Sequence, residues 1–127
     1  MKPKKILLVE DEPELAQLMK ECLLEGGYEI LIAREGPEGL EKARTEKPDL
    51  ILLDLMLPRL DGHRICGLLK KDRRFAHIPV IILTGKAHDE EARLAREMGA
   101  EAFFTKPFQS EALLGKIREL LGGKLKT

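Results

Sequence analysis

The feature that most constrains the fold is a short apolar run at residues 50–58, LILLDLMLP, in which Asp54 is the only charged residue. A run of branched apolar residues of this length is typical of a strand buried on both faces, as at the centre of a parallel sheet. A carboxylate in such a place is costly unless it is neutralised or meets a cation and hydrogen-bond donors. Asp54 therefore either ends the strand and turns the chain towards Pro58, or it belongs to a functional site.

Short apolar runs alternate with helix-like segments along the whole chain. The expected strands are Ile6–Val9, Tyr28–Ala33, Asp49–Asp54, Pro79–Thr84 and Ala102–Thr105. The expected helices run from Pro13 to about Glu25, from Pro37 to about Glu46, onward from Asp61-Gly62, from Glu90 to Met98, and onward from Ser110. Five strands alternating with five helices predict a doubly wound α/β domain whose parallel strands are joined by right-handed crossovers.

Helical spacing predicts which helix side chains face the core. The apolar positions are Leu15, Leu18, Met19, Cys22 and Leu23 in the first helix and Ile65, Cys66, Leu68 and Leu69 in the third. Because both cysteines fall in these patterns, we expect buried free thiols rather than a disulfide or a metal site. The three histidines, His63, His77 and His88, share no ligand spacing and are expected at the surface or at helix ends.

Composition narrows the class of protein. A chain of 127 residues is the size of one domain, and we expect that domain at 1–122, with 123–127 as a tail or linker stub. Lysine plus arginine and aspartate plus glutamate each number 22, which argues against nucleic-acid or membrane-surface binding through bulk charge. The apolar stretch Ile6–Val9 is too short for a signal peptide, and no segment approaches a membrane span. We therefore expect a cytoplasmic protein without direct nucleic-acid or membrane contacts.

Reactive side chains mark the ends of four expected strands. The first strand is followed by Glu10-Asp11-Glu12, the third ends in Asp54, the fourth ends in Thr84, and the fifth is followed by Lys106-Pro107. In open parallel sheets these ends meet at one edge, where ligands bind. Two carboxylates about 4 Å apart repel by roughly 4 kcal/mol at an effective dielectric of about 20. The cluster therefore calls for a hard divalent cation, and carboxylates with water suit Mg²⁺.

With these motifs the sequence resembles the receiver domain of two-component response regulators. The resemblance rests on Val9 to Glu12, on Asp54 with Leu57 to Gly62, on Pro79 to Gly85, and on Gly99-Ala100 leading to Phe103 to Phe108, in order and at the expected spacings. It spans essentially the whole chain. It implies the flavodoxin-like fold, a five-stranded parallel sheet in the order 2-1-3-4-5 with five helices.

The resemblance implies a role for each motif residue. Asp54 would accept a phosphoryl group from a phosphohistidine of a sensor histidine kinase or phosphotransfer protein. Asp11, Asp54 and the backbone carbonyl of Met56 would bind Mg²⁺. Glu10 would reach the ion directly or through water, and we rank it below Asp11 because many relatives have the shorter aspartate there. The ammonium of Lys106 would lie against the phosphoryl oxygens and offset their negative charge, as phosphoryl transfer needs.

The same resemblance implies a conformational switch and two tuning positions. The hydroxyl of Thr84 would donate to a phosphoryl oxygen, and Phe103 would rotate into the space that Thr84 leaves. The Lys106-Pro107 peptide is expected to be cis. Met56 cannot orient a hydrolytic water and Lys86 could cover the phosphoryl group, so we expect slow self-dephosphorylation. The protein is thus expected to be a signalling switch rather than an enzyme.

The family also suggests partner surfaces. The fourth helix, fifth strand and fifth helix are expected to form an output surface, which also serves for a phosphorylation-dependent homodimer if one forms. Ala102 and Lys116 stand where OmpR/PhoB-type regulators carry aspartate and arginine, so that salt-bridged dimer is not expected. The kinase-side surface would involve the first helix, where Leu15 and Leu18 are either contact residues or core. The downstream target is a separate protein or an output domain beyond this sequence.

Other interpretations differ in features that the sequence displays. An aspartate-nucleophile phosphatase of the haloacid-dehalogenase kind would usually carry a second aspartate where Met56 stands. A nucleotide or flavin binder would need a glycine-rich phosphate turn, whereas the first turn here is Glu10-Asp11-Glu12-Pro13. A degenerate receiver would lack part of the phosphorylation site, whose residue types are all present. A receiver excised from a longer regulator stays open beside a stand-alone one.

Overall fold

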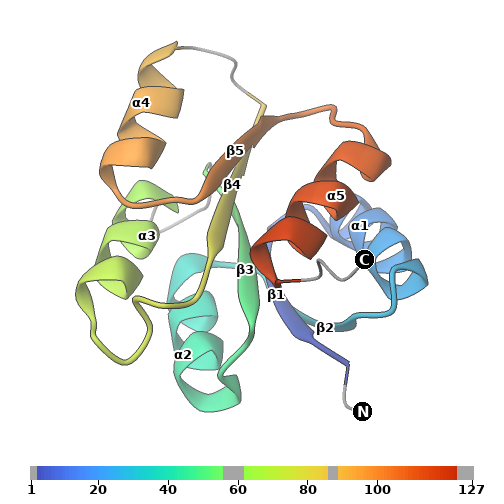
Figure 1. The fold of residues 1–127 in the computed structure, drawn as a ribbon, viewed down its shortest axis with the longest axis horizontal. Helices are drawn as coiled ribbons and strands as arrows, with labels where there is room; N and C mark the ends of the chain where they lie inside the picture. Colours follow the sequence, from blue (N-terminus) through green and yellow to red (C-terminus); the bar gives the residue numbers. More distant parts are fainter. Residues whose placement is uncertain (1–2, 56–61, 86–88, 123–127) are drawn as a thin grey trace.

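The structure, a computed structural model, describes residues 3–55, 62–85 and 89–122, except for the side chains of residues 62, 63 and 89–92. Its strands are β1 (Lys5–Val9), β2 (Glu29–Ala33), β3 (Leu50–Asp54), β4 (Val80–Thr84) and β5 (Ala102–Thr105). Its helices are α1 (Pro13–Glu25), α2 (Gly36–Glu46), α3 (Gly62–Lys71), α4 (Asp89–Glu97) and α5 (Ser110–Leu120). The strands form one parallel sheet in the order β2-β1-β3-β4-β5 (Figure 1), which confirms the predicted flavodoxin-like fold.

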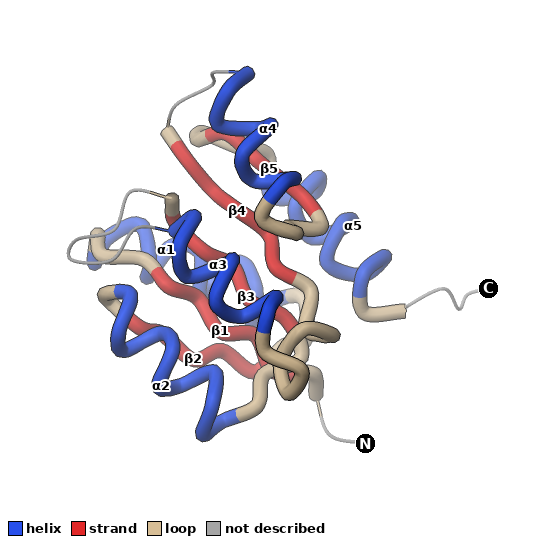
Figure 2. The backbone as a smooth tube through the Cα atoms, turned by 90° about the vertical axis from the view of Figure 1, so that its left-hand side faces the viewer, coloured by secondary structure: helices blue, strands red, loops and turns tan. Residues whose placement is uncertain are grey.

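The helices cover the sheet in two layers. α1 and α5 lie on one face, and α2, α3 and α4 lie on the other (Figures 1 and 2). Successive strand side chains point to opposite faces, so Leu53 and Ile82 enter the core beneath α2, α3 and α4, whereas Leu52 and Ile81 enter the core beneath α1 and α5. Every residue of β3 and β4 is buried, as the unbroken apolar run around Asp54 predicts.

The parallel register aligns the ends of the strands. Val9 lies opposite Leu53, and Thr84 lies opposite Thr105. Because all strands run the same way, the residues that follow β1, end β3 and β4, and follow β5 gather at one edge, the carboxyl edge of the sheet. Asp54 is the last residue of β3 and therefore sits at this edge.

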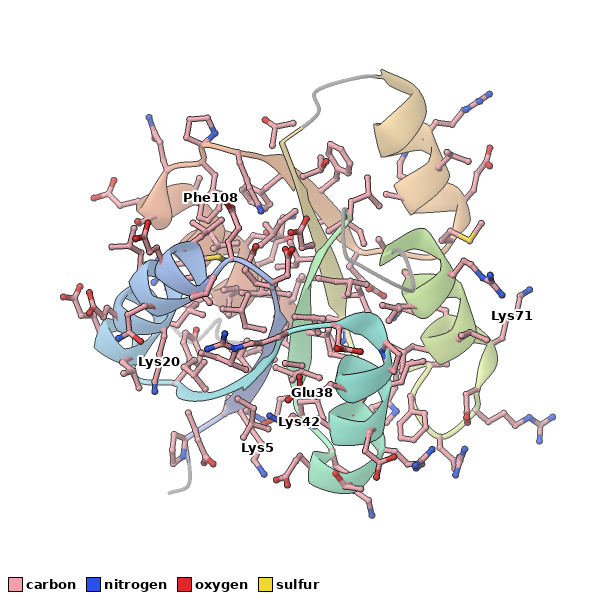
Figure 3. All side chains as sticks on the ribbon, turned by 180° about the vertical axis from the view of Figure 1, so that it is seen from behind. Lys5, Lys20, Glu38, Lys42, Lys71 and Phe108 are labelled. Atoms are coloured by element: carbon pink, nitrogen blue, oxygen red, sulfur yellow. The ribbon has the colours of Figure 1, made fainter. Side chains whose placement is uncertain are left out.

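A close contact and a polar network hold α2 against the edge. Gly39 faces Val9, and a Cβ at Gly39 would lie 3.0 Å from Val9 Cγ2. Glu38 Oε1 accepts the backbone N–H of Arg34 at 2.8 Å, and Lys42 Nζ lies 3.2 Å from the other carboxylate oxygen of Glu38. Both labelled side chains are visible on α2 in Figure 3. The helix is thus fixed directly over the last residue of β1.

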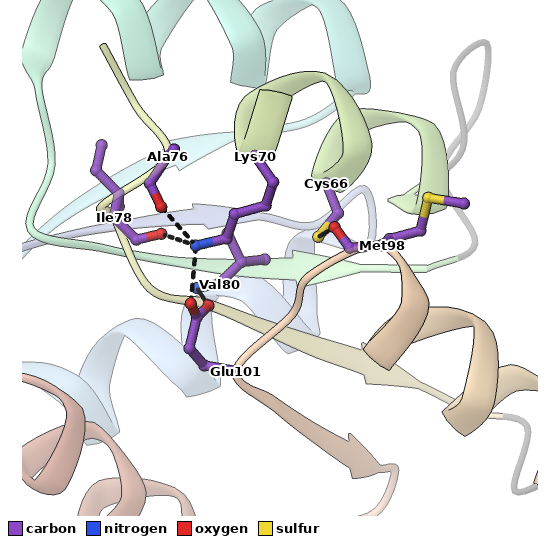
Figure 4. Close-up of polar contacts among 7 residues, drawn as sticks. All are labelled: Cys66, Lys70, Ala76, Ile78, Val80, Met98 and Glu101. Carbon is purple, nitrogen blue, oxygen red and sulfur yellow. Dashed lines mark hydrogen bonds and ion pairs between the residues drawn. The ribbon is translucent and has the colours of Figure 1, made fainter. Parts of the chain in front are cut away.

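A second network of hydrogen bonds lies at the opposite, amino edge of the sheet (Figure 4). The Lys70 ammonium donates to the carbonyls of Ala76 and Ile78, at 3.1 and 2.7 Å, and to Glu101 Oε2 at 2.9 Å. The other carboxylate oxygen of Glu101 accepts the N–H of Val80 at 2.8 Å. The end of α3, the start of β4 and the residue before β5 are therefore joined around one ion pair.

Two leucines depart from the sequence prediction. Leu18 and Leu68 were expected on the apolar faces of their helices, but they are 64% and 51% exposed. Both lie at the margin of an otherwise buried stripe, where helical spacing alone does not separate core from surface. Both cysteines are free, as predicted, with Cys66 buried and Cys22 only partly so. Among the described helices, none has the length and apolar character needed to cross a membrane.

Candidate functional site

Three carboxylates meet at the carboxyl edge. Glu10 and Asp11 follow β1, and Asp54 ends β3. One carboxylate oxygen from each lies within 4.8 Å of the others. Glu10 and Asp54 are almost fully buried, at 1% and 4% exposed, whereas Asp11 faces solvent. The acids that sequence reasoning placed at neighbouring strand ends therefore do form one cluster, partly inside the protein and partly open to solvent.

Lys106 reaches into this acidic cluster from the end of β5. Its ammonium donates to Glu10 Oε1 at 2.9 Å and to Asp54 Oδ2 at 3.3 Å. The Lys106 side chain is 18% exposed, and the two carboxylate side chains are 0% and 6% exposed. Charge interactions are stronger in such a place than at the surface. One ammonium therefore faces three carboxylates, which leaves an excess of negative charge.

The pKa values reflect both the burial of the cluster and its charges. Burial raises the pKa of Glu10 to about 7, assisted by the negative charge of Asp54 and opposed by the hydrogen bond from Lys106. Burial acts to lower the pKa of Lys106, but the hydrogen bond to Glu10 and the charge of Asp54 raise it overall. Lys106 thus stays charged near neutral pH, and Glu10 is the carboxyl that gains a proton when the pH falls below neutrality.

Backbone hydrogen bonds hold the cluster in shape. The N–H of Glu12 donates to Glu10 Oε2 at 3.2 Å. The N–H of Lys106 donates to the carbonyl of Thr84 at 2.7 Å. The peptide between Lys106 and Pro107 is cis, as expected. The strand end that carries the ammonium is therefore tied to the strand end that carries the hydroxyl.

The two residues expected to act as a switch lie on neighbouring strands. Thr84 ends β4 and is fully buried. Phe103 is a residue of β5 and lies opposite Ile82 of β4. It is half-buried and packs against the core beneath α2, α3 and α4. A cavity of about 290 Å³ beside α4 and β5 is lined in part by Phe103. The tuning positions Met56 and Lys86 lie outside the described residues, as do His88, the side chain of His63, and residues 123–127.

A groove of about 440 Å³ runs from Lys106 along α1 and the start of α5. It is lined by Glu12, Leu15, Leu18, Met19, Cys22, Lys106, Pro107, Phe108, Ser110 and Leu113. Of the two leucines whose role the sequence left open, Leu15 is half-buried and packs against the core, whereas Leu18 is largely exposed. Leu18 is therefore a surface residue, and its groove opens beside the acidic cluster.

The donor set of the cluster fits Mg²⁺. Carboxylate oxygens are the ligands that this ion takes in proteins, usually from one or two acids with waters completing the shell. The exposed position of Asp11 leaves room for waters. Burial raises the pKa of Glu10, and the negative charge of Asp54 adds to this rise. The cluster of Glu10, Asp11 and Asp54 could therefore hold a metal ion.

Comparison with known proteins establishes the family. Residues 6–118 match the response regulator receiver domain family. The chain is a response-regulator receiver domain. The receiver is 40% identical over 118 residues to the alkaline phosphatase synthesis transcriptional regulatory protein PhoP of Bacillus subtilis, covering 93% of this chain and 48% of PhoP. Receiver domains of this family are signalling switches of two-component systems that interact with histidine kinases or phosphotransfer proteins.

Relatives of two lengths match this receiver. It is 36% identical over 120 residues to the polar-differentiation response regulator DivK of Brucella anthropi, covering 94% of this chain and 98% of DivK. It spans about half the length of PhoP and of the other transcriptional regulators among the first curated relatives. A solved receiver domain, that of the sensor histidine kinase PA1611 from Pseudomonas aeruginosa, superposes with a TM-score of 0.88 at 26% identity, covering 95% of this chain and 99% of that one. That structure is described with a magnesium ion coordinated in its active-site cleft.

Sequence reasoning missed the ion pair between Lys106 and Glu10. It assigned Lys106 to the phosphoryl group and Glu10 to the metal, with no contact between them. The two residues are 96 positions apart in the sequence, and their strands are separated in the sheet by β3 and β4. A signal was present, because both are long side chains of opposite charge that follow strand ends at the same edge.

Proposed function

We propose that Asp54 accepts a phosphoryl group from the phosphohistidine of a sensor histidine kinase or phosphotransfer protein. The observation that carries this proposal is the Lys106 ammonium, which lies 3.3 Å from an Asp54 oxygen inside a cluster of three carboxylates. In the transfer, a carboxylate oxygen of Asp54 forms a bond to phosphorus. The phosphorus–nitrogen bond breaks, and its electron pair stays on the imidazole of the donor.

The chain supplies three parts of the transfer site. Asp11, Asp54 and the Met56 carbonyl would hold Mg²⁺, with Glu10 as a direct or water-mediated ligand. Bound there, Mg²⁺ supplies positive charge against the oxygens of the transferred group. Lys106 exchanges its contact with Asp54 for a charge-assisted hydrogen bond to a phosphoryl oxygen. Its ion pair with Glu10 keeps the ammonium beside the acceptor before the donor arrives.

Phosphorylation is proposed to act on Thr84 and Phe103. The Thr84 hydroxyl donates to a phosphoryl oxygen and draws the end of β4 inward. Phe103 borders a cavity beside α4 and β5, so a rotation of its ring changes the shape of that surface. Two new contacts thereby bias a two-state element, and the altered surface selects a downstream protein, an output domain or a second copy.

The phosphoryl group is proposed to be long-lived. The Met56 thioether is too weak a hydrogen-bonding group to orient a hydrolytic water, and Lys86 is proposed to cover the phosphoryl group. Replacing Met56 with asparagine should speed the decay of the phosphorylated form. An unchanged decay rate would show that this position does not limit hydrolysis.

The donor protein is proposed to dock in the groove beside Lys106. Leu18 is 64% exposed there, and covering its side chain with a partner would remove apolar surface from water, which favours binding. Leu24, also on α1, is 49% exposed but does not line the groove. Leu18→Ala should weaken transfer from a phosphohistidine donor, and Leu24→Ala should not. Both variants should react normally with acetyl phosphate. An equal loss of transfer from the phosphohistidine donor in both variants would show that the groove is not the docking site.

The deciding experiment is the intact mass of the protein after incubation with acetyl phosphate, with and without Mg²⁺. We expect a single Mg²⁺-dependent phosphoryl adduct, absent from Asp54→Ala. An adduct that persists in Asp54→Ala would place the acceptor elsewhere. No adduct, together with intact Mg²⁺ binding, would identify an interaction module that works without phosphorylation.

A further inference from the structure

A cavity of about 590 Å³ lies at the amino edge of the sheet, opposite the acidic cluster. It is formed by the connections from α2 to β3 and from α3 to β4, which both lie at the lower edge in Figure 1. Its lining consists of Arg44, Lys47, Pro48, Asp49, Arg74, Phe75, His77 and Ile78. Its volume falls in the range of about 300–1,000 Å³ that is typical of small-molecule sites. Nothing in the phosphorylation chemistry uses these residues.

The floor of this amino-edge cavity is apolar. Pro48, Phe75 and Ile78 are all buried, and Phe75 is 8% exposed. Phe75 and Ile78 belong to the core beneath α2, α3 and α4, so their positions are set by packing. A flat apolar body placed on this floor would be covered on one side without any rearrangement of the core.

The rim of the cavity is rich in nitrogen donors. Arg44, Lys47, Arg74 and His77 are exposed side chains from the two connections and from the end of α2. The Arg74 guanidinium is held in place by both carboxylate oxygens of Asp72, at 3.1 and 2.8 Å, and lies 4.9 Å from the centre of the Phe75 ring. A donor fixed in this way loses little freedom when it binds an anion.

Of the acids near the cavity, Asp49 lines it, but the acids that pair with its arginines do not. Arg44 pairs with Glu41 and Arg74 pairs with Asp72, but neither acid lines the cavity. Asp49 does line it, and one oxygen of that carboxylate accepts the backbone N–H of Lys5 at 2.8 Å. The cations therefore line the cavity, whereas the acids that pair with Arg44 and Arg74 do not. Attraction for an anion is consequently short-ranged and depends on direct contact rather than on long-range steering.

We propose that this cavity binds a small organic anion that joins a flat apolar body to a carboxylate. The apolar body lies on Pro48, Phe75 and Ile78, and the carboxylate accepts hydrogen bonds from the rim. Within the described residues the Lys47 ammonium makes no hydrogen bond or ion pair, so it is available to the carboxylate without breaking an existing contact. The phosphoryl acceptor is at the other edge of the sheet, and the proposed site is therefore independent of the proposed function.

The test uses phenylpropionate as the probe. Phenylpropanol and phenylpropylamine serve as controls that have a similar apolar body but a neutral or a cationic end group. Each is titrated into the whole ¹⁵N-labelled protein, and backbone amide shifts are followed by NMR. For phenylpropionate we expect saturable shifts confined to residues 44–49 and 74–78. Its affinity should exceed that of phenylpropanol by about tenfold, the gain from charge-assisted hydrogen bonds. Phenylpropylamine should not bind at these residues.

Matched variants separate the rim from overall charge. The cavity variant replaces Arg44, Lys47 and Arg74 with glutamine, and the control replaces Arg34, Arg93 and Arg118, which are exposed away from the cavity, with the same residue. Both lose three positive charges. We expect about a tenfold loss of phenylpropionate affinity in the cavity variant and less than about twofold in the control. The proposal is overturned if the shifts occur at the groove beside Lys106, if the alcohol binds as well as the acid, if both variants weaken equally, or if no shift saturates.

Discussion

Two lysine–carboxylate contacts lie at opposite edges of the same sheet and are built differently. Lys70 donates to two carbonyls and one carboxylate, and its partner Glu101 also accepts a backbone N–H. Lys106 donates to two carboxylates, with a third acid in the same cluster. The first site balances one charge against one. The second holds more negative charge than its lysine balances.

The difference shows how the same residue types serve stability in one place and function in another. At the Lys70 site each donor has an acceptor and the charges match one to one, so the pair has no reason to rearrange. An ammonium shared between like charges can exchange partners at small cost when a cation or a phosphoryl group arrives. What separates the two sites is the ratio of charges, the number of neutral acceptors and the deeper burial of the carboxylates at the second site.

Removing each lysine in turn should have different effects on phosphorylation. Lys106→Met should slow phosphorylation by acetyl phosphate by about 100-fold, because it removes a fixed positive charge from the site where charge develops. Lys70→Met should leave the rate unchanged. The rates are measured from the phosphoryl adduct by intact mass. A similar loss in both variants would mean that the two lysines are not functionally distinct.

Stability should show the reverse pattern. Lys70→Met should lower the free energy of unfolding by about 2–3 kcal/mol, because Glu101 and two carbonyls lose their partner in a half-buried place. Mg²⁺ should not restore this loss. In Lys106→Met, any loss should be recovered by Mg²⁺, which replaces the missing cation. Urea unfolding with and without Mg²⁺ measures the free energy of unfolding of both variants. If Mg²⁺ restored the stability of Lys70→Met, the proposed difference between the two lysine sites would be contradicted.

The burial of Glu10 at the carboxyl edge also predicts a pH dependence. Glu10 has an ordinary pKa of 4.5 and a pKa of about 7 in the folded protein, so the folded chain holds this proton more tightly than the unfolded chain. Without divalent cations, the Glu10 contribution to the free energy of unfolding should therefore fall as the pH rises from 4.5 to 7. The expected change is on the order of 1–3 kcal/mol. Measured by urea unfolding across this range, the free energy of unfolding should change less with pH in Glu10→Gln than in the unaltered protein. An equal change in both would refute the raised pKa of Glu10.

The smallest expected effect concerns the helix that lies over the carboxyl edge. In Gly39→Ala the new methyl would meet Val9 at 3.0 Å, so the gain in helix propensity is outweighed and stability should fall by about 1 kcal/mol. At Gly115 in α5 a new methyl would meet no atom within 4 Å, so Gly115→Ala should raise stability by about 0.5–1 kcal/mol. Thermal or urea unfolding gives both values. Stabilisation by both substitutions would show that Val9 yields easily.

The sequence predicted the fold and the cluster of acids well, because both depend on local pattern. The alternation of apolar runs and amphipathic segments was enough to place β3 and β4, and their ends located Asp54 and Thr84. Parallel strands then brought these ends together without any knowledge of packing. The roles of these residues in phosphorylation remain predictions.

Other features could not be read from the sequence. Lys70 resembles an ordinary cation in the last turn of a helix, and its partner Glu101 is 31 residues away in the chain. Leu18 and Leu68 have core-like spacing, yet they lie at the margin of the buried stripe of each helix and are exposed. The amino-edge cavity depends on how two connections lie against each other, which no local pattern encodes.

The 2.7 Å hydrogen bond from the Lys106 amide to the Thr84 carbonyl has a practical consequence. An amide proton's resonance frequency is sensitive to the length and angle of the bond it makes. A displacement of the end of β4 relative to the backbone that carries the ammonium changes the length or angle of this bond. The Lys106 amide is therefore a native spectroscopic reporter of the switch, and it requires no label or substitution near the acceptor.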